Sequence, residues 1–211
     1  MNYQNEEFES KNLDHLGIIA GIIDEIEIVE KINEIFLTDS REKVNTGELV
    51  KAIILNGLGF VSRPLYLFSQ FFEDKAIEHL LGSGIKASDL NDDKIGRVMD
   101  KLYKHGLSKL FLIIALEVVN KFGVTTKYSH LDSTSLHLHG QYNNCLNNLE
   151  QELGTSRENP ILITHGYSRD HRPDLKQCIL DLIVSSDGDV PLFFRGASGN
   201  ESDKSVWRYP P

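Results

Sequence analysis

The chain has 211 residues, of which 40% are hydrophobic and 25% charged, and this ordinary globular composition excludes a collagen-like, low-complexity or fully disordered protein. Its two cysteines, Cys145 and Cys178, form no zinc-type pair, so we expect neither a disulfide scaffold nor a zinc site, and a reducing cytoplasmic location. The formal net charge is −9, but residues 1–50 alone carry 12 acidic and 4 basic side chains, so the remainder is nearly neutral and the charge neither supports nor excludes DNA as a partner.

Residues 1–11 are polar and acidic, which predicts a flexible N-terminus rather than a signal peptide. Residues 12–123 are predicted to form a helical domain, because apolar residues recur at spacings of three and four. The first two predicted helices carry the following stripes: Leu13, Leu16, Ile19, Ala20 and Ile23, then Ile26, Val29, Ile32, Ile35 and Phe36. Thr46 is the predicted N-cap of a third helix, which carries the apolar residues Leu49, Ala52, Ile53 and Leu55 and which Gly57 and Gly59 should end.

The second half of the helical domain contains three further predicted helices. Pro64 should lie near the first turn of one, and Asn91 should cap another. The last is predicted over residues 107–122, ending at Gly123. Because it is apolar on most sides, we expect it to be the buried centre of a helical bundle. Its apolar run is too short to span a bilayer, so no membrane partner is expected.

After Gly123 the pattern changes from helical to β-type. Residues 127–139 are rich in β-formers, and two apolar runs at 178–184 and 190–194 flank a turn containing Asp-Gly, which predicts a hairpin. A short β-type run also occupies 161–164, after a polar loop predicted at 140–159. These features predict an α+β protein with a second domain at 124–211.

The segment from His130 to His139 holds the first candidate for chemistry. In a straight strand side chains alternate between faces, so His130 and Asp132 share one face while His137 and His139 share the other. A bulge would change that arrangement. An independent metal-dependent hydrolase using these four residues is therefore one alternative, and an aspartate among scattered, solvated histidines is another.

Two groups of basic residues are candidates for contact with DNA. Residues 165–177 interleave basic side chains with Tyr167, a combination suited to phosphates and unstacked bases. A second group recurs along one predicted helix face at spacings of three and four. The predicted DNA-binding residues are Arg97, Lys101, Lys104, Arg169, His171, Arg172 and Lys176. The alternatives are an ordinary solvated loop and an ordinary solvated helix face.

A series of motifs, in order along residues 10–205, resembles the N-terminal half of DDE-type transposases of bacterial insertion sequences. The strand segment His-Leu-Asp-Ser-Thr resembles the family's strand that bears the first catalytic aspartate. Residues 165–177 resemble its signature His-Gly-Tyr-Ser-Lys-Asp-His-Arg-Pro-Asp-Leu-Lys-Gln, with Arg169 where lysine is common. The other segments that carry the resemblance are 91–97, 100–103, Pro191-Leu192 and Gly199-Asn200-Glu201-Ser202-Asp203.

The resemblance implies a ribonuclease-H-like catalytic domain in residues 124–211, of which this chain holds the first β-strands. In such enzymes three carboxylates hold two Mg²⁺ or Mn²⁺ ions, which assist phosphodiester cleavage and strand transfer during DNA transposition. Asp132 matches the first carboxylate and is therefore the predicted catalytic and metal-binding residue. The ends of the mobile element would be the DNA partner.

The chain departs from the family after this first carboxylate. Asp187, Asp189 and Asp203 do not match the family's second aspartate, and no residue matches its glutamate. One carboxylate cannot hold two divalent ions, so we expect a C-terminally truncated, catalytically incomplete transposase that does not bind Mg²⁺ stably on its own. The alternative is a regulatory, DNA-binding or dimerisation fragment that forms a homodimer, or pairs with full-length transposase and interferes with it.

Overall fold

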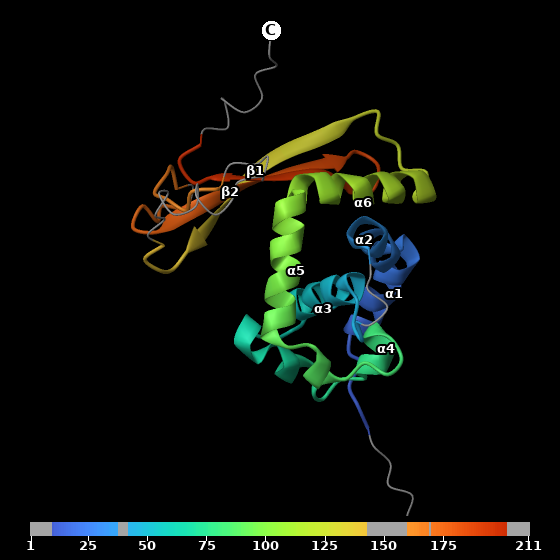
Figure 1. The fold of residues 1–211 in the computed structure, drawn as a ribbon. Coiled ribbons are helices and arrows are strands. Elements are labelled where there is room, and N and C mark those ends of the chain that lie inside the picture. Colours follow the sequence, from blue (N-terminus) through green and yellow to red (C-terminus); the bar gives the residue numbers. More distant parts are fainter. Residues whose placement is uncertain (1–9, 38–41, 143–159, 169, 202–211) are drawn as a thin grey trace, which may run out of the picture. The chain divides into compact units, whose positions relative to one another are not determined.

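The computed structural model describes residues 10–37, 42–142, 160–168 and 170–201 (Figure 1). These residues form two compact units, one up to Lys101 and one from Leu102 onward. Several predicted features lie outside the described residues: most of the flexible N-terminus, most of the loop at 140–159, Cys145, Arg169 and Asp203.

The first unit is helical, as predicted. Its elements are α1 (Leu16–Ile26), α2 (Ile28–Phe36), α3 (Thr46–Leu58), the 3₁₀ helix η1 (Leu65–Phe72), α4 (Ile77–Leu81), the 3₁₀ helix η2 (Ala87–Asp89) and most of α5 (Asp92–His105). The predicted apolar stripes supply its core: Leu16, Ala20 and Ile23 of α1, Ile32 of α2, and Leu49, Ala52 and Leu55 of α3 are all buried. The segment after Pro64 is a 3₁₀ helix.

The start of α3 differs from the prediction by one residue. Asn45, rather than Thr46, is the N-cap: its side chain accepts a hydrogen bond from the Glu48 amide (2.9 Å), and the Glu48 carboxylate accepts one from the Asn45 amide (2.8 Å). Thr46 is buried and is already the first residue of the helix. Because its backbone is helical, it lacks the extended conformation that an N-cap residue needs. The predicted cap at Asn91 is confirmed by its hydrogen bond from the Lys94 amide (2.9 Å).

The second unit contains a three-stranded antiparallel sheet in the order β1 (Ser129–Leu138), β2 (Lys176–Ser185), β3 (Pro191–Ser198). The predicted hairpin is confirmed as β2 and β3. The short run at 161–164 forms a single bridge, in which Thr164 pairs with Gln177. Within the described part of the chain, the other edge of β1 pairs with no strand.

Helix α6 (Leu107–Phe122) belongs to the second unit, although the sequence boundary was expected near 123. Phe111 packs edge-on against Phe194 of β3, with ring centroids 4.8 Å apart. Only Leu110 and Ala115 of α6 are buried, whereas Leu112 and Leu116 are exposed. The expectation of a helical-bundle centre was therefore wrong, because within the second unit α6 packs on the sheet. None of the described helices has the length and apolar character needed to cross a membrane.

Gly47 provides a test of the packing between α2 and α3. A Cβ atom there would lie 2.3 Å from the Val29 carbonyl oxygen. We therefore expect Gly47→Ala to lower the free energy of unfolding by about 1–3 kcal/mol, because backbone must shift to admit the methyl group. Urea unfolding followed by far-UV circular dichroism measures this change. In the same helix, Gly57 has open space around its Cβ position, so Gly57→Ala should raise stability by about 0.5–1 kcal/mol; equal effects of both substitutions would contradict the packing.

Candidate functional site

Asp132, the predicted catalytic residue, lies in the middle of β1, opposite Leu182, and is exposed. Its carboxylate accepts a hydrogen bond from the neighbouring Ser133 amide (2.9 Å). The pairing of β1 with β2 is continuous from Ser129 to Leu138, without a bulge, so Asp132 and His137 lie on opposite faces of the strand. The structure therefore does not bring together the four residues of the metal-dependent hydrolase hypothesis.

The face opposite Asp132 holds a buried polar network that the sequence did not predict. Ser133, Asp181 and Arg195 lie in register on β1, β2 and β3. The Ser133 hydroxyl donates to the Asp181 carboxylate (2.6 Å), and the Arg195 guanidinium donates to it from Nε (3.1 Å) and Nη2 (2.8 Å). Asp181 is only 2% exposed. The signal in the sequence was a single acidic residue within the apolar run at 178–184.

Arg195 also connects this network to the segment after β3. Its Nη2 atom donates to the Glu201 carboxylate at 2.8 Å. Burial lowers the pKa of the Arg195 guanidinium, but the hydrogen bonds to Glu201 and Asp181 outweigh burial and raise it above its ordinary value. Arg195 therefore stays charged, and its hydrogen bond to Glu201 joins the Gly-Asn-Glu segment at 199–201 to the sheet.

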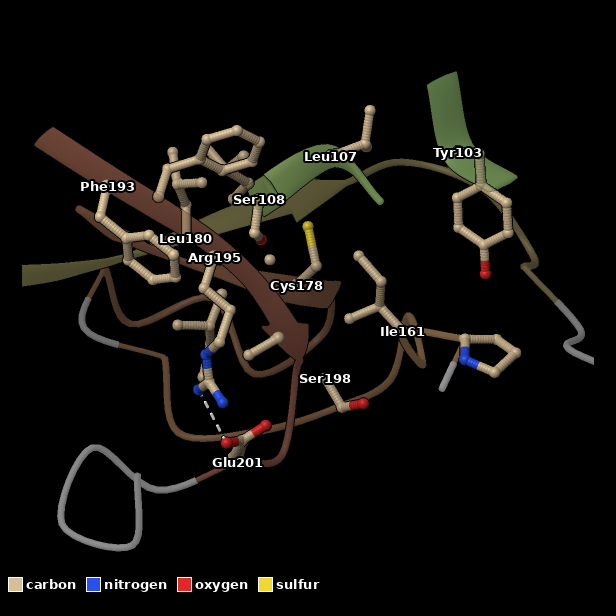
Figure 2. A pocket seen from close by; sticks show the side chains of 16 residues that line it. Tyr103, Leu107, Ser108, Ile161, Cys178, Leu180, Phe193, Arg195, Ser198 and Glu201 are labelled. Atoms are coloured by element: carbon tan, nitrogen blue, oxygen red, sulfur yellow. Dashed lines mark hydrogen bonds and ion pairs between the residues drawn. The ribbon is translucent and has the colours of Figure 1, made fainter. Parts of the chain in front are cut away.

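A pocket of about 710 Å³ lies beside this network in the second unit. Figure 2 shows the Arg195 side chain pointing toward Glu201, with the free thiol of Cys178 among the lining groups. Most of the remaining lining is apolar, with Leu107, Leu180 and Phe193 among its side chains. The pocket can accommodate an apolar group, and nothing in the sequence predicted it.

Two of the motif segments contact each other at one end of the sheet, and we call the contact between Gly166, Gln177 and Gly199 the lock. Gln177 of β2 is 1% exposed, and its side-chain amide donates to the carbonyl oxygens of Gly199 (2.7 Å) and Tyr167 (3.2 Å). A Cβ at Gly199 would lie 2.0 Å from the Gln177 carbonyl oxygen, and one at Gly166 would lie 1.8 Å from the Gly199 carbonyl oxygen. Only glycine fits at these two positions, so the motifs at 165–177 and 199–201 form one structural unit.

His137 is held by the loop that follows this lock. Its Nε2 atom lies 3.0 Å from the Ser168 hydroxyl, and its Nδ1 atom lies 3.4 Å from the Asp170 carboxylate. The Ser168 hydroxyl also accepts a hydrogen bond from the Arg172 amide (2.8 Å). In the structure His137 therefore positions the loop, which is a role that its sequence neighbours did not indicate.

The predicted DNA-binding residues of the loop have different environments. His171 is exposed. Arg172 makes a two-pronged contact with Asp174, at 2.9 and 2.8 Å, and Lys176 donates to the backbone carbonyl oxygens of Gln141 and Tyr142. Arg172 and Lys176 thus already use hydrogen-bonding capacity within the protein.

The predicted residues on α5 are separated by the structure into two groups. Arg97 and Lys101 line a pocket in the first unit together with Lys94 of the same helix and Lys43 from the segment before α3. Lys104 is exposed and does not line this pocket. The contribution of Lys43 could not be read from the helical spacing, since it is far away in the sequence.

The donor groups around Asp132 do not complete a site for Mg²⁺. Across the described ranges, no three or more His, Cys, Asp or Glu side chains are grouped so that they could hold a metal ion. Mg²⁺ requires near-octahedral oxygen coordination, and the acidic residue on the neighbouring strand, Asp181, faces the opposite side of the sheet and is bound by Arg195.

Comparison with known proteins assigns the chain to a family. Residues 8–116 match the model of the family described as Domain of unknown function (DUF4277), and the chain belongs to this family. No curated protein matches the chain, and no solved structure matches it either.

The two carboxylates Asp132 and Asp181 should respond differently to the same substitution. We expect Asp181→Asn to destabilise the sheet by about 1.5–3 kcal/mol, because it leaves the Arg195 guanidinium facing an amide instead of a carboxylate. Asp132→Asn, the matched control, should change stability by less than about 0.5 kcal/mol because that side chain is exposed. Amide hydrogen exchange of β2 measures both effects. Equal protection in the two variants would contradict a structural role for Asp181.

The Arg172–Asp174 contact predicts a specific pH dependence. The hydrogen bond from Arg172 lowers the pKa of the Asp174 carboxyl from its ordinary 3.8 to about 2. A carboxyl with a lowered pKa in the folded chain favours folding above pH 3.8, and this contribution is lost as the pH falls through about 2. We expect an NMR titration of the Asp174 carboxyl carbon to show a midpoint near 2, and Arg172→Gln to return it toward 3.8. A midpoint unaffected by this substitution would exclude the contact.

Proposed function

We propose that this chain is a DNA-binding protein of the DDE transposase type, in which Asp132 is one carboxylate of a metal-dependent phosphoryl-transfer site. One observation carries the proposal. Two motif segments that are separate in the sequence, 165–177 and 199–201, join at the Gln177 end of the antiparallel sheet, and the third, 130–134, lies on the first strand of the same sheet. Because each segment individually is a weak signal, their placement on one sheet supports the resemblance more strongly than any one of them.

The position of Asp132 is consistent with this role. Its carboxylate is exposed on the central part of β1, whereas the other acidic residue of the strands, Asp181, is buried and paired. The exposed Asp132 carboxylate is accessible from solvent, whereas the Asp181 carboxylate is bound by Ser133 and Arg195. The ribonuclease-H-like architecture belongs to the proposal, as the three strands support it by their order and by the aspartate on the first of them.

Binding of DNA is the activity that we assign to this chain itself, because Asp132 is the one carboxylate that the resemblance supplies to it. The cations that line the first-unit pocket, and the exposed His171 in the second unit, provide groups for contact with phosphates. Chemistry at the phosphodiester would require further carboxylates beside Asp132.

We expect the full chain to bind a random-sequence DNA duplex in fluorescence anisotropy, with the logarithm of the association constant falling linearly with the logarithm of salt between about 0.05 and about 0.2 M. The reason is that Lys and Arg side chains displace counterions from the phosphates. A duplex with uncharged methylphosphonate linkages is the matched control and should bind weakly. If the charged duplex does not bind even at the lowest salt concentration, the proposed function is wrong.

A further inference from the structure

A pocket of about 380 Å³ in the first unit collects positive charge from two segments far apart in the sequence. Lys94, Arg97 and Lys101 lie on one face of α5, because spacings of three and four residues place side chains above one another on successive turns. Lys43 joins them from the segment before α3. Among the residues that line this pocket, Glu42 alone is acidic.

Part of the pocket lining is apolar and buried. Val44, Leu49 and Val98 line it and are 2%, 4% and 3% exposed. Thr46, the first residue of α3, also contributes, so the positive end of the α3 dipole lies at the pocket. The Asn45–Glu48 capping box already uses amide groups of the first turn, so recognition of a ligand falls to the charged side chains.

Two of the four cations are held in place by one acidic residue. Lys43 Nζ lies 2.7 Å from the Asp89 carboxylate, and Lys94 Nζ donates to the Asp89 backbone carbonyl oxygen (3.3 Å). The hydrogen bond from Lys43 lowers the pKa of the Asp89 carboxyl. Asp89 thus orients two ammonium groups while cancelling the charge of only one.

The other two cations have no such contacts. The side chains of Arg97 and Lys101 make no hydrogen bond or ion pair with any other residue that the structure describes, and both residues are exposed. Like charges gathered on one pocket repel each other unless an anion lies between them. The pocket therefore has an excess of positive charge with donors free to bind an anionic group.

We propose that this pocket binds a phosphate group of the DNA backbone, with Arg97 and Lys101 as direct ligands and Lys94 and Lys43 as supporting cations. This inference rests on the proposed function, since it names the site through which DNA is bound. A guanidinium donates to two phosphate oxygens at once, and an ammonium acts as a point charge beside it. The volume admits a phosphate together with ordered water, at roughly 30 Å³ per water molecule. Exposure of Arg97 and Lys101 leaves the pocket accessible to a long polymer.

The test is a set of charge variants of the full chain, with DNA affinity measured by anisotropy over a salt series. Arg97→Glu combined with Lys101→Glu should weaken binding by about tenfold or more, and should reduce the salt slope by about 1 for each phosphate that the protein no longer neutralises. Lys94→Gln should weaken binding less. Neither change removes an ion pair between described residues, so circular dichroism should show an unaltered fold.

Two lysines outside the pocket make the test specific. Lys109→Glu, on α6, is the matched control and should leave the affinity unchanged. Lys104→Glu distinguishes the pocket from a diffuse basic helix face, because it makes the same charge change on α5 away from the pocket. If Lys104→Glu weakens binding as strongly as the Arg97/Lys101 double variant, the pocket assignment is overturned in favour of a diffuse face.

The remaining outcomes separate the pocket from the proposed function. DNA binding that the pocket variants do not alter would overturn the pocket and leave the proposed function intact. If the unmodified chain binds no DNA while inorganic phosphate shifts the NMR resonances of Lys94 and Arg97, the proposed function fails, and the pocket is a site for free phosphate rather than for DNA.

Discussion

The arrangement of the second unit depends on one buried carboxylate. Asp181 is almost inaccessible to solvent, and a charge in that position is tolerated only when hydrogen-bonding partners surround it. Ser133 and Arg195 satisfy it from the two neighbouring strands, so one residue connects all three strands in the observed register. Because side chains alternate along β1, burying Ser133 places its neighbour Asp132 on the opposite face, where it is exposed. The exposure of Asp132 and the burial of Asp181 thus both follow from the same strand register.

A second constraint determines which basic side chains already have partners within the protein. The lock formed by Gly166, Gln177 and Gly199 fixes the loop that follows, and that loop uses Arg172 and Lys176 in contacts with the protein itself. The basic side chains of the first unit differ, because Arg97 and Lys101 have no side-chain partner among the described residues. Under the proposed function, Arg97 and Lys101 of the first unit would therefore contact the phosphate backbone, whereas Arg172 and Lys176 of the basic loop already have partners within the protein.

The family model matches residues 8–116, which include every residue of the proposed phosphate pocket and end within α6. The sheet that carries Asp132 lies entirely beyond the matched region. Under the proposed function, the DUF4277 part would hold DNA through backbone phosphates, and the sheet would present the carboxylate for phosphoryl transfer.

The sequence by itself determined most of the local structure. Apolar spacing located the stripes of α1, α2 and α3, the Asn91 cap located α5, and the Asp-Gly turn located the β2–β3 hairpin, because these features depend on residues close together in the chain. Contacts between distant residues were decided only by the tertiary structure. The packing of α6 on β3, the pairing of Asp181 with Arg195 and the approach of Lys43 to Arg97 each join segments whose separation leaves no periodic signal. Burial and charge pairing depend on which surfaces of the folded chain contact each other. The spacing of residues within one segment does not predict those contacts.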